Sequence, residues 1–324
     1  MPLSLKTGIV FGGTALAGEA GYLLRRRVGM VRTGSSLLLL SAILFQIGLF
    51  VLAQIAGVSL QNPLLLVVGA VGIVVLAYTI RSSPLLVAGL LDVLTAMGWA
   101  LEQRYSALPQ AFIAPCAFVL AGIVLYAVGR APWVRGDGAR FSGVYGAIGL
   151  LSVLMPLYLM TDAGVWQDVH SYGAQVLTVP AWFPIVVGVA IAAGLSTLIG
   201  RRDAEDGVLA GIFAALAGLI GVAAYQPEWG IYLVGFNLLY FALVITVCVK
   251  GSVANNAWVV NFGLIFLAFG LFARYYDYFA SVLDRAMFLV IGGVVLLGVA
   301  TILEWARRRL LTGPSRTFVE ALEI

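Results

Sequence analysis

Histidine and cysteine are scarce in this chain of 324 residues. The only histidine is His170, so a haem with two histidine ligands or a histidine-rich metal site cannot be built from this chain alone. Cys116 and Cys248 both fall inside apolar runs, where thiols behave as small hydrophobic groups, and a disulfide framework is not expected. We therefore expect no cofactor and no bound metal.

Motifs of common enzymes are also missing. The sequence contains no G-x-S-x-G, no P-loop, no G-x-G-x-x-G and no C-x-x-C. No lysine lies in the middle of an apolar run, which excludes a Schiff-base lysine there. We predict no catalytic residues, and an intramembrane enzyme ranks below a transport or structural role.

Charged residues make up only 10% of the chain and hydrophobic residues 62%, whereas about 25% of an average soluble domain is charged. This composition predicts a single membrane domain over 1–324, with the lipid bilayer and other membrane proteins as its partners. The net charge of +4 comes from basic residues that flank apolar runs. That placement indicates membrane topology rather than nucleic-acid binding.

Apolar runs long enough to span a bilayer, about 17 to 25 residues, recur through the chain. They cover 5–24, 35–57, 62–80, 84–103, 109–129, 141–160, 180–200, 207–226, 230–249, 257–273 and 286–306. The pattern predicts an all-α, polytopic transmembrane helix bundle. The first run is rich in glycine and contains Glu19, so it could lie at the surface, and we predict ten or eleven spans.

Basic residues predict the orientation of these spans. If odd-numbered runs end in the cytoplasm, 15 of the 19 basic residues lie on that side. Only Lys6, Arg104, Arg274 and Arg285 lie outside. The positive-inside rule then places the C-terminus in the cytoplasm and, with eleven spans, the N-terminus outside.

An internal repeat is compatible with the spacing of the runs. An offset of 170 residues places Arg104-Tyr105 over Arg274-Tyr275 and the first five runs over the last five. The predicted repeats cover 5–130 and 180–306, with the run 141–160 as a linker. Residue identity is poor, so the support lies in hydropathy and basic charges that fall in register, and an even offset predicts parallel repeats.

Polar side chains inside the apolar runs are the candidate site residues, because such groups are costly in a bilayer. Asp92, Thr95, Trp99 and Glu102 follow one another at i, i+3, i+7 and i+10 and form a polar stripe on the helix 84–103. The stripe should face the bundle interior or enclosed water. Either a protonated Asp92 hydrogen-bonds a neighbouring helix, or the stripe lines a pathway.

Amide side chains in other runs have the same two interpretations. Gln46, Asn237 and Asn261 are most simply interhelical hydrogen-bonding groups, and they could equally line the same cavity. Small residues four positions apart, such as Gly8 with Gly12 and Gly207 with Gly211, predict close helix packing, most simply inside the bundle and alternatively at a dimer face.

The region before the last run predicts a short helix on the membrane surface over 274–285. Its polar residues Arg274, Asp277, Ser281 and Asp284 recur at helical spacing opposite aromatic and aliphatic residues. Arg274 and Asp277 can pair across one turn. Glu304, three and four residues before Arg307 and Arg308, can be neutralised in the same way.

The C-terminal pattern resembles a known family. It consists of Asn237, Asn261-Phe-Gly263, Arg274-Tyr-Tyr-Asp277, Leu283-Asp-Arg285, Phe288, Gly292-Gly293 and Leu303-Glu304 followed by Arg307 to Arg309. Over about the last 90 residues the chain is similar to an uncharacterised family of bacterial predicted multi-pass membrane proteins, a domain of unknown function. The resemblance implies a location in the bacterial inner membrane and no established activity. It marks Arg274, Asp277, Arg285 and Glu304 as candidate residues without assigning them a role.

Two functions fit these observations. The first is a transporter or channel-like protein for a small solute or lipid of unknown identity, and the second is a non-catalytic structural or accessory subunit of a membrane protein complex. A polar cavity would favour the first. A dry, filled bundle with an exposed apolar face would favour the second.

Overall fold

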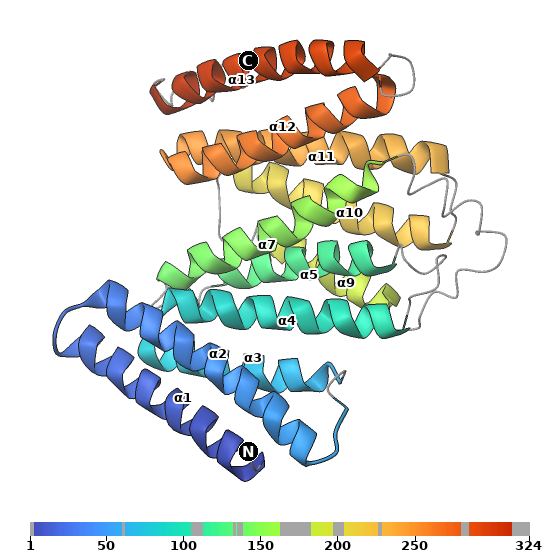
Figure 1. Cartoon of the computed structure of the whole chain (residues 1–324). Coiled ribbons are helices and arrows are strands. Elements are labelled where there is room, and N and C mark those ends of the chain that lie inside the picture. Colours follow the sequence, from blue (N-terminus) through green and yellow to red (C-terminus); the bar gives the residue numbers. More distant parts are fainter. Residues whose placement is uncertain are drawn as a thin grey trace. The chain divides into compact units, whose positions relative to one another are not determined.

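The computed structural model describes residues 3–59, 62–104, 113–131, 134, 139–162, 183–196, 204–225, 229–279 and 285–312. In these ranges all regular structure is α-helical (Figure 1). The helices are α1 (Leu3–Arg26), α2 (Val31–Ile55), α3 (Leu64–Ile80), α4 (Ser83–Arg104), α5 (Ile113–Arg130), α7 (Ala139–Met160), α9 (Phe183–Ser196), α10 (Ala204–Tyr225), α11 (Trp229–Val253), α12 (Ala257–Phe279) and α13 (Arg285–Thr312). Each predicted apolar run overlaps one of these helices, which confirms the all-α class.

Eight of the described helices are long and apolar enough to cross a membrane: α2, α4, α5, α7, α10, α11, α12 and α13. Helices α3 and α9 are apolar but have only 17 and 14 residues. Helix α1 is not among the eight, and it is the run that the sequence marks as the weakest span. The described structure is therefore compatible with an integral membrane protein.

The prediction of a separate surface helix over 274–285 is wrong for residues 274–279. Residues 274–279 are the last turns of α12, because no glycine or proline follows Gly270 to interrupt that helix. Residues 280–284 lie outside the described ranges, and α13 begins at Arg285.

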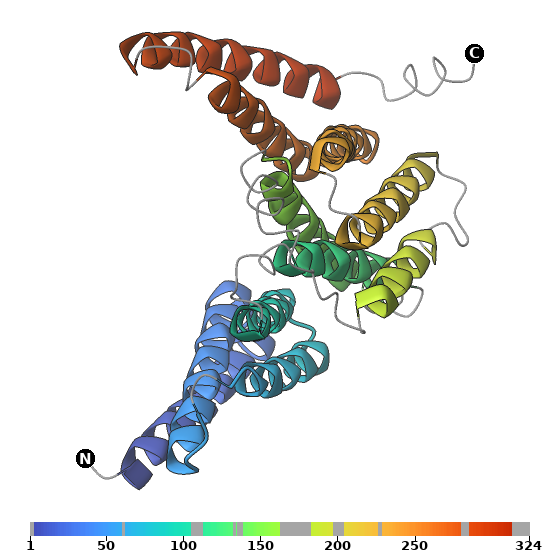
Figure 2. The ribbon, with the colours of Figure 1, turned by 90° about the vertical axis from the view of Figure 1, so that its right-hand side faces the viewer.

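The chain divides into two compact units, Met1–Ser152 and Val153–Ile324. The boundary falls inside α7, the helix that the sequence predicts as a linker. In the first unit α1 packs along α2 and α3 along α4, and in the second α9 packs along α10, α11 along α12 and α13 against α12 (Figures 1 and 2). The proposed repeat itself stays a prediction.

In the first unit, glycines allow backbones to touch. A Cβ atom added to Gly34 of α2 would lie 2.7 Å from the carbonyl oxygen of Gly21 in α1. One added to Gly149 of α7 would lie 2.7 Å from the backbone nitrogen of Tyr126 in α5. Residues with side chains at these positions would force the helices apart, so glycine is required there.

The glycine pairs that the sequence spacing favours do not all pack in this way. An added Cβ atom at Gly8, Gly12 or Gly211 meets no described atom within 4 Å. The expectation of close packing is therefore wrong for these three glycines in the described structure. Spacing shows only that a small-residue face exists, whereas the position of the helix crossing decides which glycine is covered.

The apolar cores of the two units are built from different helices. In the first unit Leu85 and Leu86 of α4 are fully buried, and Tyr78 packs edge-on against Phe141 with ring centroids 4.8 Å apart. In the second unit the largest fully buried side chains lie on α9, α10 and α11, namely Phe183, Phe213, Phe236 and Tyr240. These aromatic groups place α11 at the centre of the second unit's core.

The close contact of α1 and α2 predicts a large effect of one methyl group. Gly34→Ala should lower the free energy of unfolding by about 1–3 kcal/mol, because the added carbon overlaps the α1 backbone. Gly12→Ala in α1 is the matched control and should be neutral or slightly stabilising, since its added carbon meets open space. Thermal unfolding of the purified protein in detergent measures both. Equal effects of the two variants would contradict the close approach of α1 and α2 at Gly34.

Candidate functional site

Three helices of the second unit meet at Thr161, which follows the last residue of α7. Its side chain is buried, with 2% exposure. Arg274 of α12 donates from Nη2 to the Thr161 hydroxyl oxygen at 2.9 Å, and Asn237 of α11 donates from Nδ2 to the Thr161 carbonyl oxygen at 3.2 Å. We call Thr161, Asn237 and Arg274 the Thr161 junction.

The Thr161 hydroxyl takes part in two hydrogen bonds at the junction, one as donor and one as acceptor. The Thr161 hydroxyl donates to the Tyr158 carbonyl oxygen at 2.6 Å while it accepts from Arg274. The second Asn237 bond goes to the Leu233 carbonyl oxygen of its own helix at 2.8 Å. A buried hydroxyl with both a donor and an acceptor partner is held in one orientation, so the junction fixes the end of α7 against α11 and α12.

Arg274 also carries an ion pair. Its Nη1 lies 2.9 Å from Oδ2 of Asp277, one helical turn further along α12, which confirms the predicted pair. The side chains of Arg274 and Asp277 are 21% and 30% exposed. The guanidinium therefore bridges a buried hydroxyl on one side and a partly solvated carboxylate on the other.

Aromatic rings pack beneath the junction. The Tyr158 ring lies 6.2 Å from the ring of Tyr240 and 6.4 Å from that of Phe269, measured between centroids. The buried Tyr240 hydroxyl donates to the Phe266 carbonyl oxygen. Gly270 is required beside it, because an added Cβ atom would lie 2.5 Å from the Tyr240 ring. Tyr158, Tyr240 and Phe269 thus form an aromatic layer next to the junction, which we call the aromatic floor.

A small pocket of about 210 Å³ opens at the junction. It is lined by Tyr158, Leu159, Asp162, Phe272, Ala273, Arg274, Tyr276 and Asp277. Two carboxylates and one guanidinium give the lining a formal charge of −1 at neutral pH. We call this cavity the junction pocket.

No family model, curated protein or solved structure matches this chain. The resemblance of the C-terminal region to an uncharacterised family therefore stays a prediction. Function has to be argued from the geometry of the described residues.

The predicted polar stripe of α4 lies in the first unit. Thr95, Trp99 and Glu102 line an open groove of about 450 Å³ beside Phe118 of α5. Thr95 is exposed and donates to the Leu91 carbonyl oxygen of its own helix at 2.8 Å. Asp92, the first residue of the stripe, is half-buried on the same helix. The stripe and the junction pocket thus belong to different units.

The predicted amide groups contact other helices. Gln46 of α2 donates to the Leu65 carbonyl oxygen at 3.4 Å, and Asn261 of α12 accepts from Nε of Arg307 in α13 at 2.8 Å. Glu304 lies 3.2 Å from Arg307 and 2.8 Å from Arg308, as predicted. Of the four residues marked by the resemblance, Arg274 and Asp277 meet at the junction. Glu304 lies in the last turns of α13, at whose other end Arg285 begins the helix.

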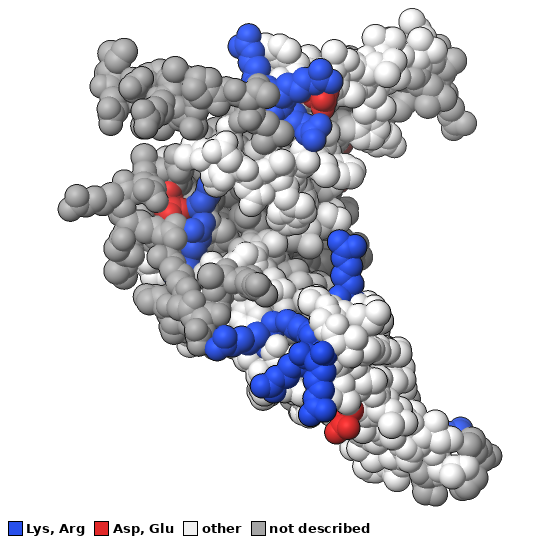
Figure 3. Space-filling view, turned by 90° about the vertical axis from the view of Figure 1, so that its left-hand side faces the viewer, with Lys and Arg blue, Asp and Glu red and all other residues white. Residues whose placement is uncertain are grey.

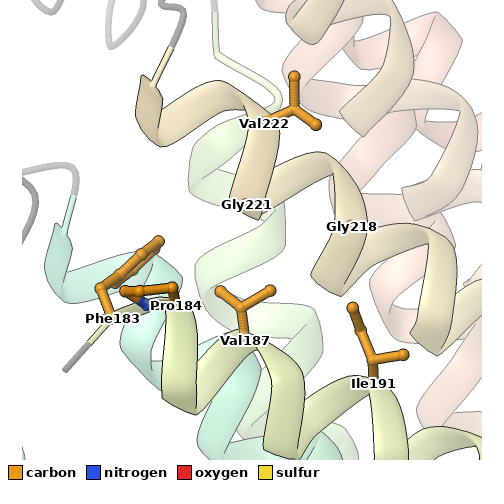
Figure 4. Close-up of a pocket in the computed structure, with 7 residues that line it drawn as sticks. All are labelled: Phe183, Pro184, Val187, Ile191, Gly218, Gly221 and Val222. Atoms are coloured by element: carbon orange, nitrogen blue, oxygen red, sulfur yellow. The ribbon is translucent and has the colours of Figure 1, made fainter. Parts of the chain in front are cut away.

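An apolar groove lies elsewhere in the second unit, between α9 and α10 (Figure 4). It holds about 470 Å³ and is lined by Phe183, Pro184, Val187, Ile191, Gly218, Gly221 and Val222. Gly218 and Gly221 leave room for it opposite Val187 and Ile191. The lining has no ionisable group, so this groove offers no chemistry beyond contact with apolar chains. Among the described residues no group of three or more metal-ligating side chains gathers.

Thr161 and the aromatic floor were not recognised in the sequence. Thr161 is an ordinary residue at the end of an apolar run, and Tyr158 and Tyr240 are like the other tyrosines of the chain. The one available signal was Arg274, since an arginine beside an apolar run needs a partner. Its ion-pair partner Asp277 follows from helical spacing, but Thr161 lies 113 residues away, a separation that no local pattern reveals.

The junction predicts that Thr161 matters more for stability than other threonines do. Thr161→Val keeps the shape but removes the hydroxyl that accepts from Arg274, and should lower the free energy of unfolding by about 1.5–3 kcal/mol. Thr301→Val is the matched control, because the exposed Thr301 hydroxyl bonds only within α13. Thermal unfolding in detergent compares the two. If Thr161→Val is as mild as Thr301→Val, the junction contributes little.

Proposed function

We propose that this chain is an integral, multi-pass protein of a bacterial inner membrane with ten or eleven spans. Eight described helices of sufficient length and apolarity support this. Arg25 donates to the Arg81 carbonyl oxygen, so the α1–α2 and α3–α4 turns share one end of the first unit. In the second unit the Asn261–Arg307 bond places the start of α12 beside the end of α13.

The proposed orientation puts these basic ends in the cytoplasm. Reporter fusions after Arg81, Lys250 and Arg309 should give cytoplasmic signals, because basic residues next to spans are retained on that side. Fusions near Asp168 and Glu228 should report the outside. A periplasmic signal at Arg309 would overturn the orientation. The fusions near Asp168 and Glu228 serve as internal controls, because they should give the outside signal when the fusions after Arg81, Lys250 and Arg309 give the cytoplasmic one.

We propose further that the protein is a transporter or channel-like protein, and that the junction pocket recognises the solute. The observation that carries this proposal is a negatively charged pocket whose lining includes the aromatic residues Tyr158, Phe272 and Tyr276. Carboxylates attract an ammonium group, and aromatic faces stabilise it further. A volume of about 210 Å³ restricts the ligand to a small molecule. The best-supported solute class is therefore a small solute with an ammonium group.

Choline and its uncharged analogue 3,3-dimethylbutanol test the assignment, because the two differ mainly in charge. Choline should raise the melting temperature of the full chain in nanodiscs, and the analogue should not. Asp162→Asn should weaken choline binding about fivefold to tenfold, equivalent to about 1–1.4 kcal/mol. Glu102→Gln, which changes an exposed carboxylate of the α4 groove, should leave binding unchanged. Equal responses to both compounds would overturn the ammonium assignment.

Transport is measured separately as uptake of labelled choline into proteoliposomes. Uptake above that of empty liposomes, reduced by Asp162→Asn, supports the proposal. Binding without uptake would overturn the transport role while leaving the ammonium pocket in place.

The alternative, an accessory subunit, is supported by the small buried share of α13. Only 6% of its apolar segment Val290–Arg309 is buried, against 28% or more in the other seven long apolar helices of the described structure. Val290, Val294 and Leu297 on this helix are 68%, 67% and 72% exposed. A photocrosslinker at Leu297 that captures one protein in native membranes would support the subunit role, with the exposed Val71 of α3 as the control position.

A further inference from the structure

Five arginines gather at one end of the first unit. Arg25, Arg26 and Arg27 come from the end of α1 and the turn after it, Arg32 from the first turn of α2, and Arg81 from the turn between α3 and α4. Figure 3 shows several basic side chains clustered over part of the surface, with one acidic side chain at the edge of the cluster. We call these five residues the basic end.

Four of these residues, Arg25, Arg26, Arg27 and Arg32, come from a stretch of the chain that is poor in acidic residues. Between residues 3 and 91 the only acidic residue is Glu19. Arg26 contacts Tyr22, both through its hydroxyl and over its ring, and this contact leaves the charge in place. Like charges held together repel one another, so the arrangement favours a bound anion.

The Arg25 guanidinium gives a more specific indication. Its Nη2 donates to the Arg81 carbonyl oxygen at 2.9 Å, which fixes the group across the α1–α2 and α3–α4 turns. Its Nη1 is buried and has no hydrogen-bond partner in the described structure. Ser82, the residue after Arg81, is fully buried and its hydroxyl likewise lacks a described partner. A buried donor without a partner is costly, so a ligand that accepts from the Arg25 guanidinium is favoured.

The start of α2 adds to this preference. No side chain caps its N-terminus, and its first turn contains no acidic residue. The positive end of the helix dipole therefore adds to the guanidinium charges. Gly34 holds this end close to α1, because an added Cβ atom there would lie 2.8 Å from Cβ of Arg25.

We propose that the basic end binds a phosphate group, namely that of an anionic phospholipid headgroup. Guanidinium groups match phosphate oxygens in geometry and charge, and the exposed Arg27 and Arg32 can contact a headgroup from the side. The site lies at a helix end between apolar helices, where lipid phosphates are held in a bilayer. It is independent of the junction pocket and lies in the other unit.

Binding of fluorescent phosphatidylglycerol to the full chain in detergent tests the proposal, with phosphatidylcholine as the neutral comparison. Phosphatidylglycerol should bind at least tenfold more tightly, and its binding should weaken as salt increases. Arg27→Gln with Arg32→Gln should weaken it roughly tenfold or more, because each arginine near an anionic lipid contributes. Both side chains are exposed, so this double variant should fold.

The matched control is Arg308→Gln with Arg309→Gln, which removes the same charge from α13 and should leave phosphatidylglycerol binding unchanged. Arg25→Lys keeps the charge but loses the forked donor, and should also weaken binding if it folds. Equal losses from the two double variants, or equal affinity for the two lipids, would overturn the site. Displacement of the lipid by millimolar inorganic phosphate would identify free phosphate as the ligand and overturn the lipid assignment.

Discussion

Burial alone does not select the partners of these helices, because they are apolar on almost every side. In α3, for example, Val68, Val71 and Val75 are exposed while Ala70, Ile73 and Ala77 on the opposite side are buried. A valine that faces lipid and an isoleucine that faces another helix are both in an apolar environment. Hydrophobicity therefore does not determine which helix faces pack together. The arrangement depends instead on the few positions where backbones touch or polar groups meet. Gly34 against Gly21, and Arg274 against Thr161, are such positions.

The difference between general apolar surface and a few specific contacts explains what the sequence can predict. Helices and their approximate ends follow from apolar runs, because a long apolar segment must satisfy its own backbone hydrogen bonds. Short-range pairs such as Arg274–Asp277 and Glu304–Arg308 follow from helical spacing. Contacts between distant segments do not follow. Gly12 and Gly34 are indistinguishable as sequence, and only the helix crossing makes one of them essential.

The failed prediction over residues 274–279 has the same origin. The amphipathic pattern predicts a separate helix on the membrane surface. However, no glycine or proline follows Gly270 within α12, and the helix continues to Phe279. The polar residues of that segment belong to the end of a long helix, where they meet the end of α7. The sequence shows the amphipathic pattern of these residues. It does not show their place in the fold, because amphipathicity does not distinguish a separate surface helix from the polar end of a long apolar helix.

Arg274 joins the structural and the proposed functional part of the second unit through two unequal bonds. Its bond to the buried Thr161 is shielded from water, and breaking it would leave a buried hydroxyl without its donor. Its pair with Asp277 is more open to water, since the Asp277 side chain is 30% exposed. In the proposed function, a ligand ammonium would therefore reach Asp277 rather than Thr161, and Thr161 would keep the guanidinium in place. The junction can thus stay intact as the pocket fills, so the residue that stabilises the helices need not move when a solute binds.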